Sequence, residues 1–322
     1  DWSSDVCSIF KGKQYLMYVY DVYKDIRLVG APPESIGKFG GDTDNWEWPR
    51  HTGDFSVFRV YMGADGKPAT YSTANVPLKP KYFLPVSIKG FRDGDYAMTF
   101  GYPGSTNRYE TSYGIQLSTD INNPSLVKLR DMRLKYMMDE MKKSEATKLQ
   151  LASDYAGIAN YWKFFDGETK QLLKYDIYGQ KKKAEQDFIA WANGKTGYEN
   201  LFSDYAKTYD VWRPYAMHRM YINEGINGCR LIQSASGWQT LATLMMRRDY
   251  NPEERKKAIE AADKARANYL KNNNLKADQN ILAAAVMMFY NDIDFAQQPQ
   301  AFYRELFKTY NSLEASPFKS FA

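Results

Sequence analysis

The feature that most constrains the fold of this chain is a change of hydrophobic period part-way along it. Up to about residue 106 the apolar residues come in short runs separated by Gly and Pro, whereas from about residue 118 they recur at helical spacing. Strands followed by helices are typical of the α+β class, and 322 residues suggest two domains. We therefore predict a β-rich domain over residues 1–106 and a helical domain over residues 107–322.

The β-rich part contains several segments that read as strands. Each is rich in Tyr, Val, Ile or Phe, and the segment 25–29 alternates with period two. Short strands at this spacing, with Gly and Pro turns such as 63–66 between them, favour an antiparallel barrel or sandwich. The predicted segments are 14–23, 25–29, 55–62 and 82–88, the last leading into 95–104.

Two helices in the second part carry start signals, because Asn123 precedes Pro124 and Asn251 precedes Pro252. An N-cap residue followed by Pro in the first turn is a typical helix beginning. Apolar stripes at helical spacing then predict which faces are buried, and we interpret the Met-rich ones as core. The stripes are Leu134, Met137, Met138 and Met141; Ile259, Ala262 and Tyr269, ended by residues 272–274; Ile281, Ala285, Met288 and Phe289; and Phe302, Leu306 and Tyr310.

Composition excludes several classes of function. The net charge of +5 is spread along the chain without a basic stripe among exposed aromatics, so a nucleic-acid partner is not predicted. Two cysteines, Cys7 and Cys229, and two histidines far apart form neither a disulfide framework nor a metal centre, and no cofactor is predicted. The chain begins at Asp1 with no Met and no signal peptide, which suggests an internal piece of a longer protein.

The residues 41–54 form the most informative loop. They include two Trp, three Asp, an Asn and one of the two His, a mixture that no helix or ordinary strand requires, so we interpret them as a loop that builds a site. Asp54 ends this loop directly before the predicted strand 55–62. An acid at the head of a strand is commonly a turn cap, although it is also a plausible place for chemistry.

This loop and other segments resemble the bacterial dipeptidyl-peptidase 7/11 family of serine exopeptidases, which release dipeptides from free N-termini. The resemblance covers roughly residues 11–322. The segment 94–104 also resembles the Gly-Asp-strand-Gly-x-Pro element of bacterial trypsin-like proteases. The segments that carry the family resemblance are GGDTDNWEWPRHTGDFSVFRVY (40–61), 23–40, 101–109 and 155–163.

The resemblance implies a trypsin-like antiparallel double β-barrel interrupted by a large all-α domain that caps the active site. It also implies roles for four residues. Asp54 would be the acid that orients the catalytic histidine. Asn45 and Asn160 would bind the α-ammonium of the substrate through their amide oxygens, and Trp46 would shape that end of the pocket.

This chain departs from the family pattern in the other two catalytic groups. The family's catalytic His would lie upstream of residue 1 and its nucleophilic Ser beyond Ala322, so we expect the isolated chain to be inactive. His51 is interpreted as stabilising the loop, and His218 as structural. Asp42 and Asp44 are expected to cap turns beside Asn45.

The family implies further expectations and leaves alternatives open. Peptide substrates with a free N-terminus, a homodimer, and a periplasmic or cell-surface location in a Gram-negative bacterium are implied by resemblance only. The resemblance leaves open whether the enzyme prefers an acidic or a hydrophobic residue before the cleaved bond. An aromatic-rich helical glycan-binding surface protein without catalysis would also suit the aromatic composition. A third alternative is a catalytically dead relative whose helical part serves only as a partner surface.

Overall fold

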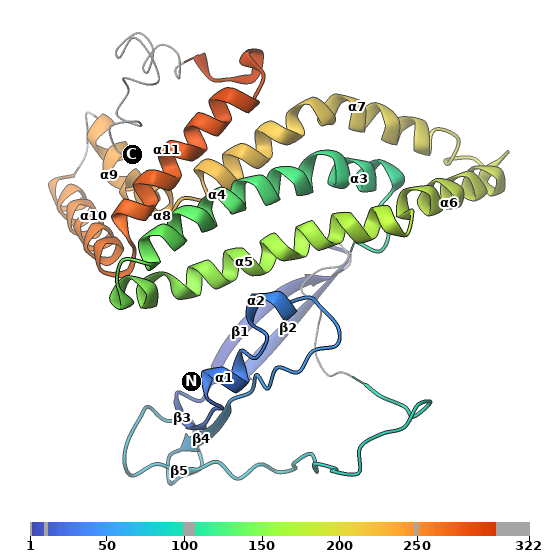
Figure 1. Cartoon of the computed structure of the whole chain (residues 1–322). Coiled ribbons are helices and arrows are strands. Elements are labelled where there is room, and N and C mark those ends of the chain that lie inside the picture. Colours follow the sequence, from blue (N-terminus) through green and yellow to red (C-terminus); the bar gives the residue numbers. More distant parts are fainter. Residues whose placement is uncertain (1, 10–11, 99–106, 248, 250, 301–322) are drawn as a thin grey trace. The chain divides into compact units, whose positions relative to one another are not determined.

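A computed structural model describes residues 2–9, 12–98, 107–247, 249 and 251–300 (Figure 1). The chain is α+β with helices dominant. It divides into two compact units, residues 1–105 and residues 106–322, which we call the β unit and the helical unit and describe separately. Part of the predicted segment 95–104, and the whole predicted helix around Phe302, Leu306 and Tyr310, lie outside the described residues.

Two small antiparallel sheets make up the β unit. The first pairs β1 with β2, and the second has the order β3–β4–β5. The predicted segments 14–23, 25–29 and 55–62 therefore all contain strands, although the last strand begins at Val57. The predicted turn at 63–66 is present, with Gly66 at φ +80°. The strands are β1 (Trp2–Ile9), β2 (Gln14–Asp21), β3 (Asp25–Gly30), β4 (Val57–Met62) and β5 (Val76–Pro77).

β4, the strand after Asp54, has no buried residue. Leu28 pairs with Phe58 across β3 and β4, yet these side chains are 62% and 56% exposed. Among residues 3–9 and 12–98, only Asp25 is buried. The strands therefore form through their ladder hydrogen bonds without a second layer, among the described residues, to cover their apolar side chains.

Asp25 is held by a polar cluster that fixes the second sheet. Arg27 donates to both carboxylate oxygens, at 3.0 and 2.8 Å, and Asn75 Nδ2 donates to Oδ2 at 2.8 Å. The Arg27 guanidinium also lies over the Tyr61 ring, 3.7 Å from its centre. These hydrogen bonds, chiefly those from Arg27, lower the pKa of Asp25 to about 2. The charged Asp25 carboxylate can thus be buried because both of its oxygens accept hydrogen bonds.

The predicted strand 82–88 is wrong, and no strand forms over residues 95–98 either. An extended segment becomes a strand only when another strand accepts its backbone hydrogen bonds, and Pro85 also lacks a donor. No barrel or sandwich closes within the described part of the β unit, which has sheets of two and three strands.

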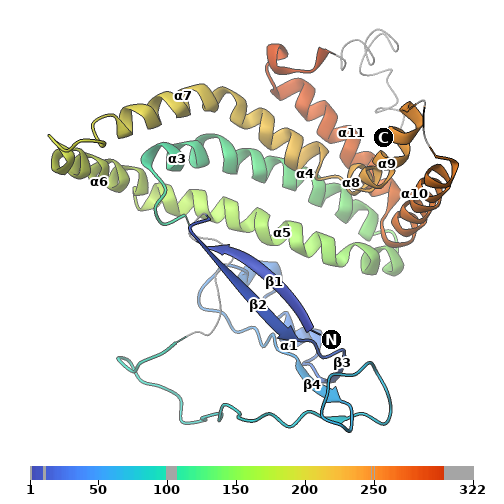
Figure 2. The ribbon, with the colours of Figure 1, turned by 180° about the vertical axis from the view of Figure 1, so that it is seen from behind.

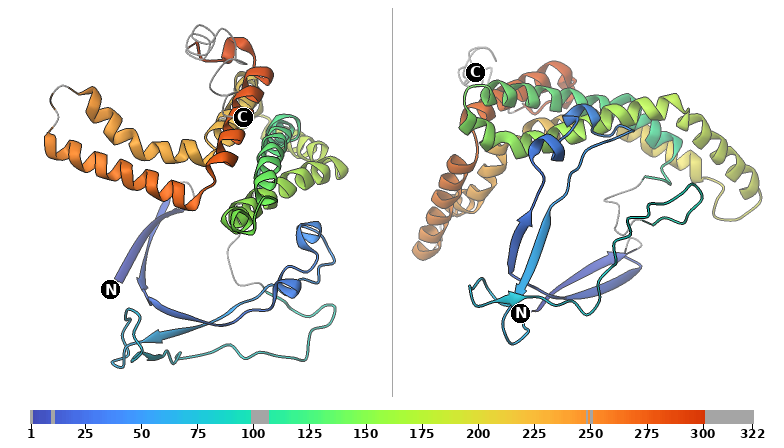
Figure 3. Two further views of the ribbon diagram at one scale, coloured as in Figure 1. Left: turned by 60° about the vertical axis from the view of Figure 1, so that its left-hand side comes forward. Right: turned by 60° about the horizontal axis from the view of Figure 1, so that its bottom comes forward.

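In the helical unit α4 lies between α5 and the pair α7 and α11, as Figures 1 and 2 show from opposite sides. α9 and α10 form a hairpin that projects from the end of the unit near α8 (Figure 3). The helices are α3 (Ser112–Leu117), α4 (Asn123–Met141), α5 (Glu145–Lys174), α6 (Ile177–Ala192), α7 (Leu201–Met220), α8 (Arg230–Ala235), α9 (Gln239–Met246), α10 (Pro252–Asn272) and α11 (Leu275–Asp292). Shorter turns are the π-helical η1 (Ser118–Asn122) and η2 (Tyr221–Ile226), and the 3₁₀ turns η3 (Ser236–Trp238) and η4 (Phe295–Gln297).

One of the two predicted helix beginnings is confirmed. The Asn251 side chain accepts a hydrogen bond from the backbone of Glu253 at 2.9 Å, as an N-cap does. Asn123 is not an N-cap, because α3 continues through η1 directly into α4. Its buried side chain instead donates to Glu168 of α5 at 2.9 Å, so it joins two helices.

Two apolar clusters form the core of the helical unit, and two of the four predicted stripes contribute to them, those on α4 and α11. The stripe on α10 is buried outside these clusters, through Ala262 and Tyr269. Ile259 is an exception, since it is 40% exposed while the small Ala258 is buried in its place beside Ala262. α10 therefore packs through two alanines in its first half and through Tyr269 near its end. One cluster contains Leu129, Tyr221, Phe289 and Ile293, and the other contains Met137, Leu151, Cys229, Ala277 and Ile281.

Candidate functional site

The loop that carries the predicted site is tied to itself at both ends. It includes the short helix α2 (Gly41–Asp44) and follows α1 (Glu34–Gly37). The backbone N–H of Gly53 donates to the Ile36 carbonyl at 3.0 Å, and the Thr52 hydroxyl donates to the Phe39 carbonyl at 2.8 Å. These bonds place the residue before Asp54 against the segment that precedes α2.

Asn45 and Trp46 lie side by side where α2 ends. Asn45 is half-buried with an extended backbone, whereas Trp46 has φ +61° and an indole that is 56% exposed. A positive φ is uncommon for a bulky residue and occurs where surrounding structure holds the backbone, often at functional sites. The loop therefore presents an amide and an aromatic ring together at its surface.

Arg50, which the sequence pattern did not single out, contacts the predicted binding residue Asn45. Its guanidinium donates to Asn45 Oδ1 at 3.4 Å and to Thr52 Oγ1 at 3.2 Å. A rigid fork of donors between these two groups restricts how the Asn45 amide can turn. The signal was present, because Arg50 stands in the same fourteen-residue loop.

Asp54 is exposed in the β unit, three residues after exposed His51. It stands just before β4, as predicted. Trp48 is 89% exposed, so its ring packs little within the described β unit. His218 has the predicted structural role, since its ring packs edge-on against Phe289 at 5.3 Å.

Asn160 belongs to the helical unit, on the long helix α5, and is half-buried beside buried Ala159. The structure thus brings Asn45, Trp46 and Asp54 into one loop and places Asn160 in the other unit. The roles of these four residues remain predictions.

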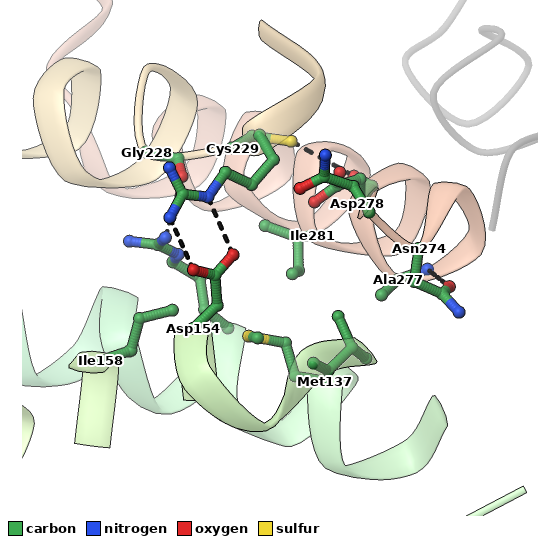
Figure 4. Close-up of a pocket in the computed structure, with 13 residues that line it drawn as sticks. Met137, Asp154, Ile158, Gly228, Cys229, Asn274, Ala277, Asp278 and Ile281 are labelled. Atoms are coloured by element: carbon green, nitrogen blue, oxygen red, sulfur yellow. Dashed lines mark hydrogen bonds and ion pairs between the residues drawn. The ribbon is translucent and has the colours of Figure 1, made fainter. Parts of the chain in front are cut away.

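The helical unit also contains a small pocket of about 20 Å³ between α4, α5, α8 and α11 (Figure 4). This is about the space of one water molecule and too small for a peptide. Cys229 lines it, and burial raises the pKa of its thiol to about 11. A thiol that stays protonated is inert as a nucleophile. The ion pair between Arg230 and Asp154 closes one side, at 2.7 and 2.9 Å.

Two further observations bear on the kind of protein. Within the described ranges, no three His, Cys, Asp or Glu side chains gather as metal ligands would. Among the helices that the structure describes, none combines the length and the apolar character that a membrane crossing requires.

Comparison with known proteins assigns the family. The chain belongs to the peptidase S46 family, whose sequence model matches residues 1–317. This match includes the loop of residues 41–54 and Asn160. The resemblance to dipeptidyl-peptidases is therefore confirmed at the level of the family.

Curated relatives of this chain carry two names. It is 48% identical over 222 residues to an Asp/Glu-specific dipeptidyl-peptidase of Flavobacterium psychrophilum, covering 68% of this chain and 31% of the relative. It is 39% identical over 297 residues to dipeptidyl-peptidase 7 of Porphyromonas gingivalis, covering 91% of this chain and 40% of the relative. The chain thus spans about a third of the curated relatives that it matches.

The fold agrees with a solved member of the same group. A crystal structure of Porphyromonas endodontalis DPP11 in complex with the dipeptide Arg-Glu matches with a TM-score of 0.81 at 29% identity. The match covers 98% of this chain and 45% of that one.

Proposed function

We propose that the full-length gene product is a serine-type dipeptidyl aminopeptidase that releases dipeptides from the free N-termini of peptides. The observation that carries this proposal is the family match over residues 1–317, which includes the braced loop with Asn45, Trp46 and Asp54. The names of the relatives support it, and so does the dipeptide bound by the P. endodontalis protein.

The proposed mechanism is that of a serine triad. Asp54 accepts a hydrogen bond from the N–H of a histidine outside this chain. This hydrogen bond holds the histidine in the tautomer that deprotonates the serine. The serine attacks the substrate carbonyl, the peptide bond breaks, and the shortened peptide leaves as an amine that takes its proton from the histidine. Water then hydrolyses the acyl-enzyme, which releases the dipeptide and restores the serine. Residues 1–322 on their own, lacking that histidine and that serine, are expected to bind without turnover.

The length of the released product is set by the residues that bind the substrate's N-terminal amine. The oxygens of Asn45 and Asn160 accept hydrogen bonds from the substrate's α-ammonium, and Trp46 closes the space beyond it. A buried ammonium needs several acceptors, so a carboxylate from elsewhere in the protein is expected to join them. Measuring two residues from a fixed amine makes the product a dipeptide.

We further propose that the β unit is part of a trypsin-like double β-barrel with the helical unit as its cap. The exposed apolar side chains of β3 and β4, such as Leu28 and Phe58, support this, because a sheet of this kind is stable when a second layer covers it. The barrel strands that cover them would come from the part of the relatives that this chain does not span. A homodimer and an exported, periplasmic or cell-surface location complete the proposal, on family resemblance.

The test is peptidase activity of the full-length product. Dipeptidyl fluorogenic substrates with an acidic or a hydrophobic second residue are compared with their N-acetylated counterparts. We expect release from the free-amine substrates and none from the acetylated ones. No release from any substrate, or equal release from both sets, would overturn the proposal. Gel filtration and cell fractionation test the dimer and the location.

A further inference from the structure

Arg130 of α4 forms a two-pronged ion pair with Glu224 of η2. Its Nε donates to Glu224 Oε2 at 2.9 Å and its Nη2 to Oε1 at 3.0 Å. The Arg130 side chain is only 13% exposed. A two-pronged pair of this kind fixes the plane of the guanidinium as well as its position.

Glu224 is itself fixed by the backbone that carries it. It lies in the π-helical turn η2, between buried Tyr221 and buried Gly225. A β-carbon added to Gly225 would lie 3.2 Å from a Leu129 methyl group, so α4 packs closely on this turn. π-Helical turns are rare and occur often at functional sites. The carboxylate therefore offers Arg130 a rigid anchor.

On its other side Arg130 contacts the stretch of α5 that carries Asn160. The guanidinium carbon lies 5.3 Å from the centre of the Tyr161 ring and 5.6 Å from that of Phe165. These two rings stack at 6.3 Å, one helical turn apart. Tyr161 directly follows Asn160, so Arg130 contacts the turn of α5 that carries this amide.

We propose that Arg130 is a positioning residue for Asn160, acting through the Tyr161 and Phe165 rings with Glu224 as its anchor. The inference rests on the proposed function, because it concerns the binding of the substrate's α-ammonium. α5 has 30 residues, and a small roll of so long a helix moves a short amide side chain away from a fixed ammonium. The flat guanidinium between carboxylate and rings resists that roll, whereas an ammonium group cannot stack in the same way.

The experiment uses the full-length protein and a free-amine dipeptidyl substrate. We expect Arg130→Met to raise KM roughly tenfold while kcat changes about twofold or less, because binding of the amine is weakened in ground and transition state alike. The inhibition constant of the free dipeptide product should rise by the same factor, and weak inhibition by the N-acetylated dipeptide should stay unchanged. Loss of folded protein alone would lower the apparent kcat and leave these constants where they are.

Two further variants keep the test informative if Arg130→Met folds poorly. Glu224→Gln retains the shape of the anchor without its charge, and Arg130→Lys retains the charge without the fork, so both should raise KM in the same direction by a smaller factor. The matched control is Arg230→Met, which removes another two-pronged pair, to Asp154 on the same helix α5. We expect this control to leave KM unchanged.

The outcomes separate the two proposals. Dipeptide release by the wild type with unchanged KM and inhibition constants in the Arg130 and Glu224 variants would overturn this inference alone. An equal rise of KM in Arg230→Met would also overturn it, since any pair on α5 would then serve. Absence of dipeptide release by the wild type would overturn the proposed function, and this inference with it.

Discussion

Arg50 donates a hydrogen bond to the side-chain oxygen of Asn45, with 3.4 Å between Nη1 and Oδ1. The same guanidinium donates to Thr52, whose hydroxyl donates in turn to the backbone before α2. A chain of three hydrogen bonds thus connects the proposed amine-binding amide to the base of its own loop. Because a carbonyl oxygen has two lone pairs, Asn45 can accept from Arg50 and from a substrate ammonium together.

Replacing Arg50 should therefore weaken substrate binding. We expect Arg50→Met in the full-length protein to raise KM roughly threefold to tenfold, because one hydrogen bond to a charged donor contributes about 1.5 kcal/mol or less at a partly exposed site. Steady-state kinetics on a dipeptidyl substrate measure this. The control is Arg92→Met, an exposed arginine of the same unit, and equal kinetics in both variants would contradict the role of Arg50.

Replacing Asp54 should stop turnover without unfolding the protein. We expect Asp54→Asn to lower kcat by roughly 10⁴-fold, as loss of the orienting acid does in serine triads. Its thermal unfolding midpoint should match that of the wild type, because Asn keeps the shape of the side chain and an oxygen that accepts a hydrogen bond. Asp65→Asn is the control, since Asp65 is an exposed acid of a turn in the same unit. Normal turnover by Asp54→Asn would rule out the orienting role.

The core of the helical unit should depend strongly on Phe289. This ring is 1% exposed and packs against Leu129, Tyr221 and Ile293. We expect Phe289→Ala to lower the free energy of unfolding by about 3–5 kcal/mol, because the cavity left behind adds to the lost burial. Denaturant unfolding followed by far-UV circular dichroism measures it. Exposed Met246→Ala should change stability by about 0.5 kcal/mol or less, and a similar loss in both variants would contradict the assigned core.

Asp278 should give the helical unit a component of stability that falls with rising pH. Burial raises the pKa of its carboxyl above 3.8, although the Tyr269 hydroxyl donates to it at 2.5 Å and Arg133 and Arg230 lie near. The folded state therefore binds more protons than the unfolded state. The contribution is fully present below pH 3.8 and is lost as the pH rises through the folded-state pKa.

Asp278→Asn removes this titration and keeps an oxygen that accepts from Tyr269. The unfolding midpoint in urea, measured from about pH 4 to about pH 7, should then lose the falling component that the wild type shows. Asp263→Asn, an exposed acid on the neighbouring helix α10, should leave the wild-type dependence intact. A wild-type slope preserved in Asp278→Asn would assign the effect to another group.

Local signals in the sequence predicted those elements whose causes are themselves local. Asn251 caps α10 as expected, because an N-cap needs only the next two or three backbone N–H groups. Asn123 carries the same signal and fails, because the preceding turn is already helical and Glu168, 45 residues away, takes its side chain. The apolar run 82–88 fails as a strand for a similar reason, since a strand depends on a partner that its own residues do not specify.

In the candidate site, too, residues close together in the sequence could be predicted and distant pairs could not. Asn45, Trp46 and Asp54 are close in sequence, so one loop could be recognised as a unit. The pair of Arg130 and Glu224 joins residues 94 apart, and neither has a pattern around it that indicates the other. Asn160 was identified through resemblance to a family and not through its helix, whose apolar spacing resembles that of many helices.

The burial of Asp25 has a practical consequence for producing this protein in pieces. A shortened chain of residues 107–300 would retain a hydrophobic core of its own, around Leu129 and Phe289. In a chain of residues 2–98, the only buried side chain among the described residues 3–9 and 12–98 would be the paired carboxylate of Asp25. The unpaired edges of its strands would lie in solvent, where they promote aggregation. Expression trials should therefore begin with the helices.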